Sequence, residues 1–187
     1  MRAQRPGESA LLLLDAVDVL NSAGISYAVI GAMAASVHGV VRASVDADAV
    51  LAMPVNRLAD LERQFREGGF RTELRIGDEE DPIAAVLALT DTAGNRVDLL
   101  VGLRGLETAA FSRAVDVPFQ GETLRVIGLE DFVAMKLFAH GPQDVEDATF
   151  ALANAGSRLD LTLLRRLTAQ YGPRAEATLV KLLAPTD

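Results

Sequence analysis

Residues 27–51 constrain the fold of this chain more than any other stretch. They contain a short apolar run, a glycine, a helix-like segment of small residues and a second apolar run, in that order. The second run carries Asp46 and Asp48, which project together because alternate residues of a strand share a face. Two such carboxylates repel each other unless a cation or a proton lies between them. Because hard divalent ions such as Mg2+ prefer carboxylate oxygens, the stretch predicts a metal site beside a helix that begins at Gly31.

A third acid lies much later in the chain, within the apolar run 96–101. Asp98 points to the opposite side from Val97, Leu99 and Val101, so it faces away from the core if those three pack inward. A strand placed beside residues 45–51 brings Asp98 next to the Asp-x-Asp pair. Three acids that converge from two strands can hold two cations about 3.5 to 4 Å apart, an arrangement that supports in-line attack on a phosphoryl group.

The order of the predicted elements indicates an α+β fold. Apolar periodicity predicts helices over residues 9–23, 31–37, 57–67, 129–139, 142–155, 159–171 and 174–183, and a short helix with its connection over 106–115. Strands are predicted over residues 27–30, 45–51, 70–76, 83–90, 96–101, 117–119 and 123–127. We therefore expect a mixed sheet with flanking helices in residues 1–127. A C-terminal helical part, residues 128–187, is expected to pack on that core in one compact unit.

Composition and charge argue against several classes of protein. The 187 residues are 50% hydrophobic and 24% charged, as in ordinary globular proteins, and the formal net charge of −8 argues against indiscriminate nucleic-acid binding. Cysteine is absent, which excludes disulfides and thiolate metal sites and fits a cytoplasmic protein. No apolar run approaches the roughly 20 residues that cross a bilayer, so we expect no membrane association.

Two longer patterns carry a resemblance to a known family. The first runs from the glycine to the paired acids and comprises Gly31, Ala34, His38, Gly39, Arg42, Ser44, Asp46 and Asp48. The second lies in the helical part and comprises Lys136, Asp144 and Asp147. Over roughly residues 25–155 the chain resembles the nucleotidyltransferase superfamily that shares the DNA polymerase beta palm. The resemblance implies that residues 1–127 form a nucleotidyltransferase palm-like core. Within it, the chain looks like the bacterial branch that includes the AbiE-type abortive-infection toxins.

The resemblance implies transfer of a nucleoside monophosphate from an NTP to an acceptor, with release of pyrophosphate. It implies that Asp46 and Asp48 hold two Mg2+ or Mn2+ ions, while Asp98 binds the ion that activates the acceptor hydroxyl and can accept its proton. The acceptor stays open between a tRNA 3′ end, a protein hydroxyl and a small molecule such as an aminoglycoside. A role as a toxin would add an antitoxin partner.

The resemblance also implies how the NTP is bound. The residues that it assigns to NTP binding are Gly31, Ala32, Arg42, Lys136 and Asp147. Backbone amides at the helix start formed by Gly31 and Ala32 can bind the triphosphate. Lys136, which also belongs to the catalytic set, would neutralise phosphate charge, and Arg42 would reach the same phosphates.

Simpler interpretations stay open for several of these residues. Lys136 can be a surface lysine, and Asp144 and Asp147, one turn apart, can form an exposed helix face. Arg42 can pair with the strand acids when no metal is bound. The histidine at position 38 is followed by glycine, which is typical of a helix end, so we leave it out of the catalytic set.

Three departures from the family pattern support a second hypothesis. Ala32 stands where the family usually has glycine or serine, and a serine there would contact phosphate. Gly141 and Gln143 stand where basic residues are usual, so less positive charge surrounds the phosphates. The alternative function is a nucleotide-binding or regulatory module of the same fold with weakened or lost catalysis. A third hypothesis is an antitoxin-like partner of another protein.

Overall fold

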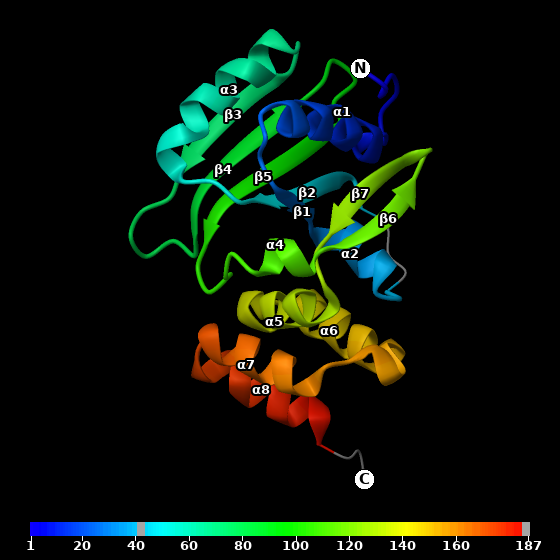
Figure 1. The fold of residues 1–187 in the computed structure, drawn as a ribbon, viewed down its shortest axis with the longest axis vertical. Helices are drawn as coiled ribbons and strands as arrows, with labels where there is room; N and C mark the ends of the chain where they lie inside the picture. The colour runs from blue at the N-terminus through cyan, green and yellow to red at the C-terminus, as the bar shows by residue number, and fades with distance from the viewer. Residues whose placement is uncertain (41–43, 185–187) are drawn as a thin grey trace.

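A computed structural model describes residues 1–40 and 44–184. Within them the strands form one seven-stranded mixed sheet, in the order β3-β4-β5-β2-β1-β7-β6 (Figure 1). The strands are β1 Tyr27–Val29, β2 Asp46–Leu51, β3 Arg71–Ile76, β4 Ile83–Thr90, β5 Arg96–Leu103, β6 Val115–Phe119 and β7 Glu122–Val126. The helices are α1 Ser9–Ser22, α2 Gly31–Val37, α3 Leu58–Glu67, α4 Ala110–Arg113, α5 Leu129–Ala139, α6 Pro142–Ala155, α7 Leu161–Gln170 and α8 Pro173–Leu183.

The predicted α+β fold is confirmed, and most element bounds agree closely with the prediction. The short helix is the clearest difference, because α4 occupies only four residues of the predicted range 106–115. Strand β5 also runs further than predicted, to Leu103. Gly102 makes that extension possible, since a Cβ at this position would press on the Cβ of Ala84 in β4.

Strands β2 and β5 run parallel in the middle of the sheet, and their register decides which polar side chains meet. Asp48 lies directly opposite Asp98, and Asp46 lies directly opposite Arg96. On its other side, β5 pairs with β4 as the predicted antiparallel hairpin. Because directly opposed residues of neighbouring strands project to the same face, these charged residues share one face of the sheet.

Helices α1 and α3 cover the other face of the sheet. Helix α1 contacts β2 and β5, and α3 contacts β3 and β4 (Figure 1). Leu87, Leu89, Val97 and Leu99 are buried in this layer, and they occupy alternate positions of β4 and β5. The alternation of strand side chains therefore turns Asp98, between two buried residues, to the face that α1 and α3 leave open.

The last four helices pack against one another beyond one end of the sheet (Figure 1). Helix α5 contacts α6, α7 and α8, and its first residue follows β7 closely. Phe132, Val133 and Leu137 of α5 belong to the same hydrophobic core as the sheet. Helix α5 thus sets the position of the helical part relative to the sheet. No helix in the described part of the chain is long and apolar enough to cross a membrane.

Candidate active site

The open face of the sheet brings together acids from two strands. Asp48 and Asp98 both line a cavity of about 390 Å³ that extends over β3, β4 and β5. Arg96 lines the same cavity, and its register partner is Asp46. Neighbouring strands lie roughly 4.8 Å apart, so the backbone holds Asp48 and Asp98 side by side. The juxtaposition predicted for Asp98 is therefore present at the level of the backbone.

The side chains of these acids are not grouped around a common point. Among residues 1–40 and 44–184, no three Asp, Glu, His or Cys side chains are arranged to hold a metal ion. Arg96 is one cause, because its Nε donates a hydrogen bond to Oδ1 of Asp98 at 2.9 Å. The side chain of Asp98 is 22% exposed, so rotation can redirect it without a change of backbone. The three carboxylates lie on the neighbouring strands β2 and β5, and together they form a set of oxygen donors that suits a hard divalent ion.

Gly31 connects β1 to α2 and lies against the acids. Its backbone angle φ is +62°, a conformation that L side chains rarely adopt. A Cβ at this position would overlap the carboxylate of Asp48. The amide of Ile30 donates to the carbonyl oxygen of Asp48 at 2.9 Å, which fixes the start of α2 against β2. Glycine is therefore required here both by conformation and by the close approach of the acid.

Lys136 of α5 is held by two carboxylates of α6. Its Nζ lies 2.7 Å from Oδ1 of Asp144 and 2.8 Å from Oδ2 of Asp147. The lysine side chain is only 13% exposed, and that of Asp147 is fully buried. The interpretations of an exposed lysine and an exposed acidic helix face are therefore wrong for Lys136 and Asp147. Gln143, one of the departures from the family pattern, lies 3.4 Å from Oδ1 of Asp147.

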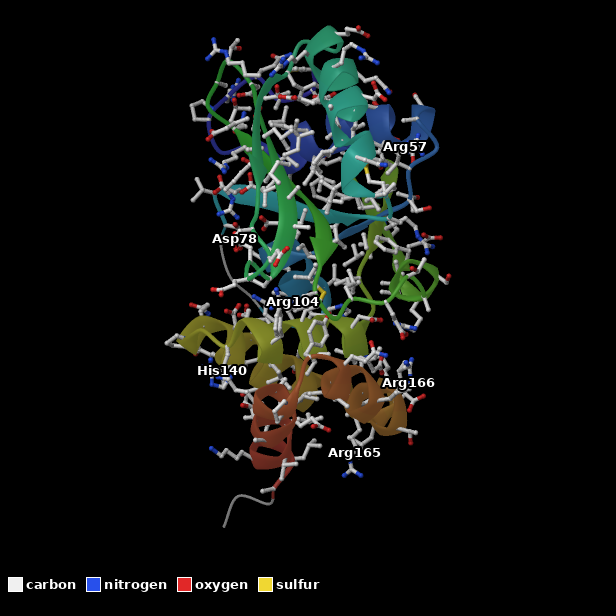
Figure 2. The ribbon with its side chains drawn as sticks, turned by 90° about the vertical axis from the view of Figure 1, so that its left-hand side faces the viewer. Arg57, Asp78, Arg104, His140, Arg165 and Arg166 are labelled. Carbon is white, nitrogen blue, oxygen red and sulfur yellow. The ribbon has the colours of Figure 1, made fainter. Side chains whose placement is uncertain are left out.

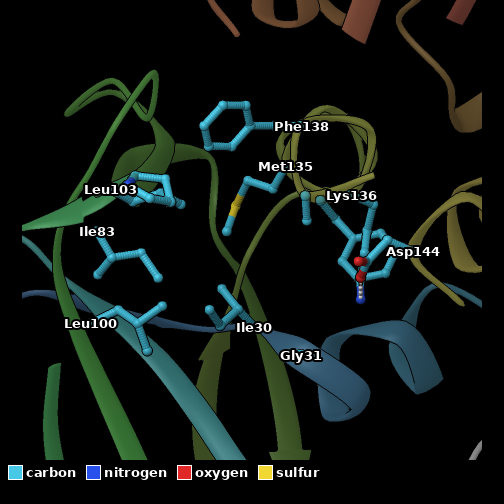
Figure 3. Close-up of a pocket in the computed structure, with 12 residues that line it drawn as sticks. Ile30, Gly31, Ile83, Leu100, Leu103, Met135, Lys136, Phe138 and Asp144 are labelled. Atoms are coloured by element: carbon cyan, nitrogen blue, oxygen red, sulfur yellow. Dashed lines mark hydrogen bonds and ion pairs between the residues drawn. The ribbon is translucent and has the colours of Figure 1, made fainter. Parts of the chain in front are cut away.

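An apolar cavity of about 210 Å³ lies between α5 and the ends of β4 and β5. Gly31, Lys136 and Asp144 lie at its side (Figure 3). Its apolar walls come from Ile30, Pro82, Ile83, Leu100, Leu103, Phe132, Met135, Phe138 and Ala139. Ile83 and Leu100 also line the acid-lined cavity, so the two cavities adjoin. No local sequence pattern indicates this cavity, because its lining residues are scattered from position 30 to position 144.

The loop between β3 and β4 contributes Pro82 to the wall of the apolar cavity. Arg104 donates to the carbonyl oxygens of Glu79 at 2.8 Å and Asp81 at 3.1 Å. Figure 2 shows Asp78 of this loop and Arg104 near the end of the sheet that faces the helical part. The backbone amide of Arg104 also donates to the carbonyl oxygen of Pro82, which fixes the wall that Pro82 contributes.

His38 ties the end of α2 to the start of α5. Its buried ring places Nε2 2.8 Å from the carbonyl oxygen of Ile127, so Nε2 carries the proton and donates. The ring also lies 5.1 Å from that of Phe132 in α5. Burial lowers the pKa of His38 below its ordinary value of 6.5. The predicted helix end at this position is observed, while Arg42 lies outside the described residues.

A charged network fastens the helical part to the sheet. Arg113 of α4 lies 2.7 Å from both Glu107 and Asp131, and Asp131 belongs to the first turn of α5. Arg166 of α7 reaches the same Glu107 at 2.8 Å (Figure 2). Hydrogen bonds from Arg166 and then Gln170 hold the pKa of Glu107 well below its usual range. The network fixes α5, the helix that carries Lys136, relative to the sheet that carries the acids.

The comparisons with known proteins bear on this geometry. No family model matches the sequence, and no curated protein matches it. A crystal structure of ANT(2")-Ia in complex with adenylyl-2"-tobramycin has a TM-score of 0.58 at 14% identity, over 87% of this chain and 98% of that chain. The solution structure of ANT(2'')-Ia gives 0.60 at 13% identity, over 94% and 96% of the two chains.

A third structure has the same architecture. The crystal structure of an antigenic nucleotidyltransferase-like protein from Paracoccidioides brasiliensis has a TM-score of 0.55 at 13% identity, over 97% of this chain and 90% of that chain. The chain has the nucleotidyltransferase fold. At these identities the likeness concerns the fold, and it agrees with the superfamily named from the sequence patterns. The narrower resemblance to the AbiE-type branch stays a prediction. In this nucleotidyltransferase fold, the paired strands β2 and β5 carry the three candidate acids.

Proposed function

We propose that this protein is an enzyme that moves a nucleoside monophosphate from an NTP to an acceptor hydroxyl with the aid of Mg2+ or Mn2+. The observation that carries the proposal is the register of β2 and β5, which sets Asp48 beside Asp98 on the open face next to Gly31. The nucleotidyltransferase fold of the chain supports the same conclusion. Like charges that lie opposite each other on neighbouring strands are destabilising. The stability of the sheet therefore does not account for two adjacent acids at its centre.

In this proposal Asp46, Asp48 and Asp98 hold two divalent ions. When bound there, the ions would supply charge neutralisation at the transferred phosphoryl group and would favour deprotonation of the acceptor hydroxyl. Asp98 accepts the proton of that hydroxyl, which requires that it leave Arg96. The backbone conformation at Gly31 keeps the first turn of α2 close to Asp48, so the amides of Gly31 and Ala32 could donate to the phosphate oxygens of the NTP.

Lys136 contacts the phosphates from the side of α5. Its ammonium group already has two carboxylate partners, so it supplies a fixed donor and little net positive charge. Asp147 acts through Lys136, because the buried carboxylate orients the lysine. Arg42 is assigned to the phosphates on the family pattern.

The acceptor, the toxin role and the cellular setting are further parts of the proposal. ANT(2")-Ia was crystallised with adenylyl-2"-tobramycin, and an aminoglycoside is accordingly one acceptor to test, beside a tRNA end and a protein hydroxyl. A bacterial, cytoplasmic toxin would arrest growth when expressed alone and recover with an antitoxin partner. Growth that is unaffected by expression would remove the toxin role without touching the transferase.

A specific observation favours a second function, a nucleotide-binding module without turnover. Arg96 occupies Oδ1 of Asp98, and Gln143 contacts Asp147 where the family usually supplies a basic residue. If Arg96 does not yield to a metal ion, the third acid cannot act on the acceptor. Such a protein would bind NTP and release it unchanged.

Label transfer distinguishes the two functions. The protein is incubated with Mg2+ or Mn2+, each labelled NTP, and either total tRNA or an aminoglycoside. We expect label on one acceptor, and a loss of about 100-fold or more in Asp46→Ala, with unchanged thermal unfolding. Asp60→Ala is the control, since this exposed acid lies on α3 and pairs with Arg63. NTP binding without transfer to any acceptor would favour the module.

A further inference from the structure

The apolar cavity beside Gly31 has walls unlike those of the acid-lined cavity that it adjoins. Ile83 and Leu103 belong to the paired strands β4 and β5, and Met135 and Phe138 project from α5 (Figure 3). The charged side chains at its side, Lys136 and Asp144, are 2.7 Å apart and bond to each other. The cavity therefore offers a large apolar surface and few groups that can read a hydrogen-bonding pattern.

The position of the cavity indicates which part of a nucleotide it can hold. Leu100 lines it and follows Asp98 by two positions, so both side chains project from the same face of β5. Lys136, the candidate phosphate contact, lies at its other side. The triphosphate, which the proposed function places against the acids, Gly31 and Lys136, would be too polar for the apolar walls of the cavity, because an uncompensated polar group is costly to bury. The faces of a nucleobase, in contrast, suit the ring of Phe138 and the thioether of Met135.

We propose that this cavity binds the base of the donor NTP by its faces and does not discriminate between the four bases. The proposal rests on the proposed transferase function, and it adds the class of donor substrate: any nucleoside triphosphate. A site that forms hydrogen bonds to a substrate rejects analogues by about 10⁴- to 10⁵-fold, whereas an apolar pocket discriminates by roughly 100-fold at most. Because its walls are apolar, this cavity should discriminate as weakly as an apolar pocket does.

Several backbone groups around the cavity already have hydrogen-bond partners within the protein. Ile83 and Leu103 face each other in the β4–β5 ladder. The carbonyl oxygen of Pro82 accepts the amide of Arg104 at 2.8 Å. The carbonyl oxygen of Lys136 accepts the amide of His140 at 3.0 Å. These interactions occupy part of the hydrogen-bonding capacity of the walls and reduce their ability to select one base edge over another.

Binding measurements with four NTPs and a baseless probe test the proposal. Dissociation constants of ATP, GTP, CTP and UTP are measured by calorimetry with Mg2+, and inorganic tripolyphosphate reports the phosphate site alone. We expect the four NTPs to agree within about 100-fold. Met135→Trp fills the cavity and should weaken every NTP by about tenfold or more, while tripolyphosphate binds as before. Leu103→Trp, from the opposite wall, should act in the same way.

Val180→Trp is the matched control, because Val180 is exposed on α8 and lines neither of the two adjoining cavities. It should leave NTP binding unchanged, and thermal unfolding checks that each variant is folded. If one NTP is preferred by far more than 100-fold, or both cavity-filling variants bind NTP like the wild type, the inference is overturned while the transferase proposal stands. If the wild type binds no NTP at all, both fail together.

Discussion

The two sides of the candidate site differ in how firmly the protein holds them. On the sheet, Asp98 is partly exposed and forms an ion pair with Arg96, which is itself 42% exposed. On the helices, Lys136 and the fully buried Asp147 form a pair that belongs to the packed interior. The sheet side can therefore adjust to an incoming cation, whereas the helix side is preformed. Substitutions on the two sides should separate activity from stability.

Removal of the lysine should have the largest effect on stability. Lys136→Met removes the ammonium group that lies 2.8 Å from the buried carboxylate of Asp147, and loss of one partner of a buried pair costs about 3–5 kcal/mol. We expect the free energy of unfolding, measured by chemical denaturation, to fall by that amount at neutral pH. On the sheet, Asp98→Asn breaks only the partly exposed ion pair with Arg96, and the free energy of unfolding should change by about 1 kcal/mol or less.

A double variant tests whether the buried charge is the cause. Lys136→Met with Asp147→Leu removes both charges, and replacing a buried pair with apolar groups is often neutral for stability. Recovery of a large part of the loss is therefore expected. If Lys136→Met costs no more than Asp98→Asn, the two sides are equally adaptable and the comparison fails.

Gly31 joins the two sides, and its replacement should have the next largest effect. Gly31→Ala forces a side chain into a left-handed conformation and against the carboxylate of Asp48. Strain of this kind costs about 1–3 kcal/mol, which thermal and chemical unfolding can measure. Gly24→Ala is a matched control, since its φ is +65° but a Cβ there meets no atom within 4 Å. Equal losses in both variants would mean that contact with the acid contributes nothing.

His38 predicts a pH dependence of smaller size. Burial lowers its pKa in the folded protein below 6.5, so the unfolded chain binds more protons between the two values. Stability should thus be highest above about pH 6.5 and fall as the pH decreases toward the folded pKa. The slope contributed by one proton is at most about 1.4 kcal/mol per pH unit.

The variant His38→Gln isolates this contribution. Glutamine retains a donor for the carbonyl oxygen of Ile127 but does not titrate. Its stability, measured by denaturation between pH 5 and 7.5, should decline less steeply than that of the wild type below about pH 6.5. Parallel curves for the two proteins would show that His38 is not protonated preferentially in the unfolded chain.

The same contrast explains what the sequence could predict. Side chains alternate strictly along a strand, so the positions of Arg96 and Asp98 predict that both project from the same face of β5. The order of the elements then suggests β2 as the neighbour of β5. The burial of Asp147 depends on how α5 and α6 pack, and no local pattern contains that information. The network around Glu107 and the walls of the apolar cavity likewise join residues far apart in the chain.

The smallest expected effect concerns the adaptable side itself. Arg96 must leave Oδ1 of Asp98 before a cation can bind there, and a partly exposed pair of this kind contributes about 0.2–1 kcal/mol. Arg96→Gln should therefore raise the affinity for Mn2+ by roughly 1.5- to 5-fold, measured by the loss of the free-ion signal in electron paramagnetic resonance.

Arg75→Gln separates this competition from a general change of charge. Arg75 lines the same cavity on β3, three strands away from Asp48, so its removal alters the net charge equally. Salt screens charges at that range more than a direct ion pair, and its effect on Mn2+ binding should be smaller. If both variants raise the affinity for Mn2+ equally, Arg96 acts only through its positive charge on this face of the sheet and not through its bond to Asp98. If Arg96→Gln lowers it, the arginine orients Asp98 for the metal instead of competing with it.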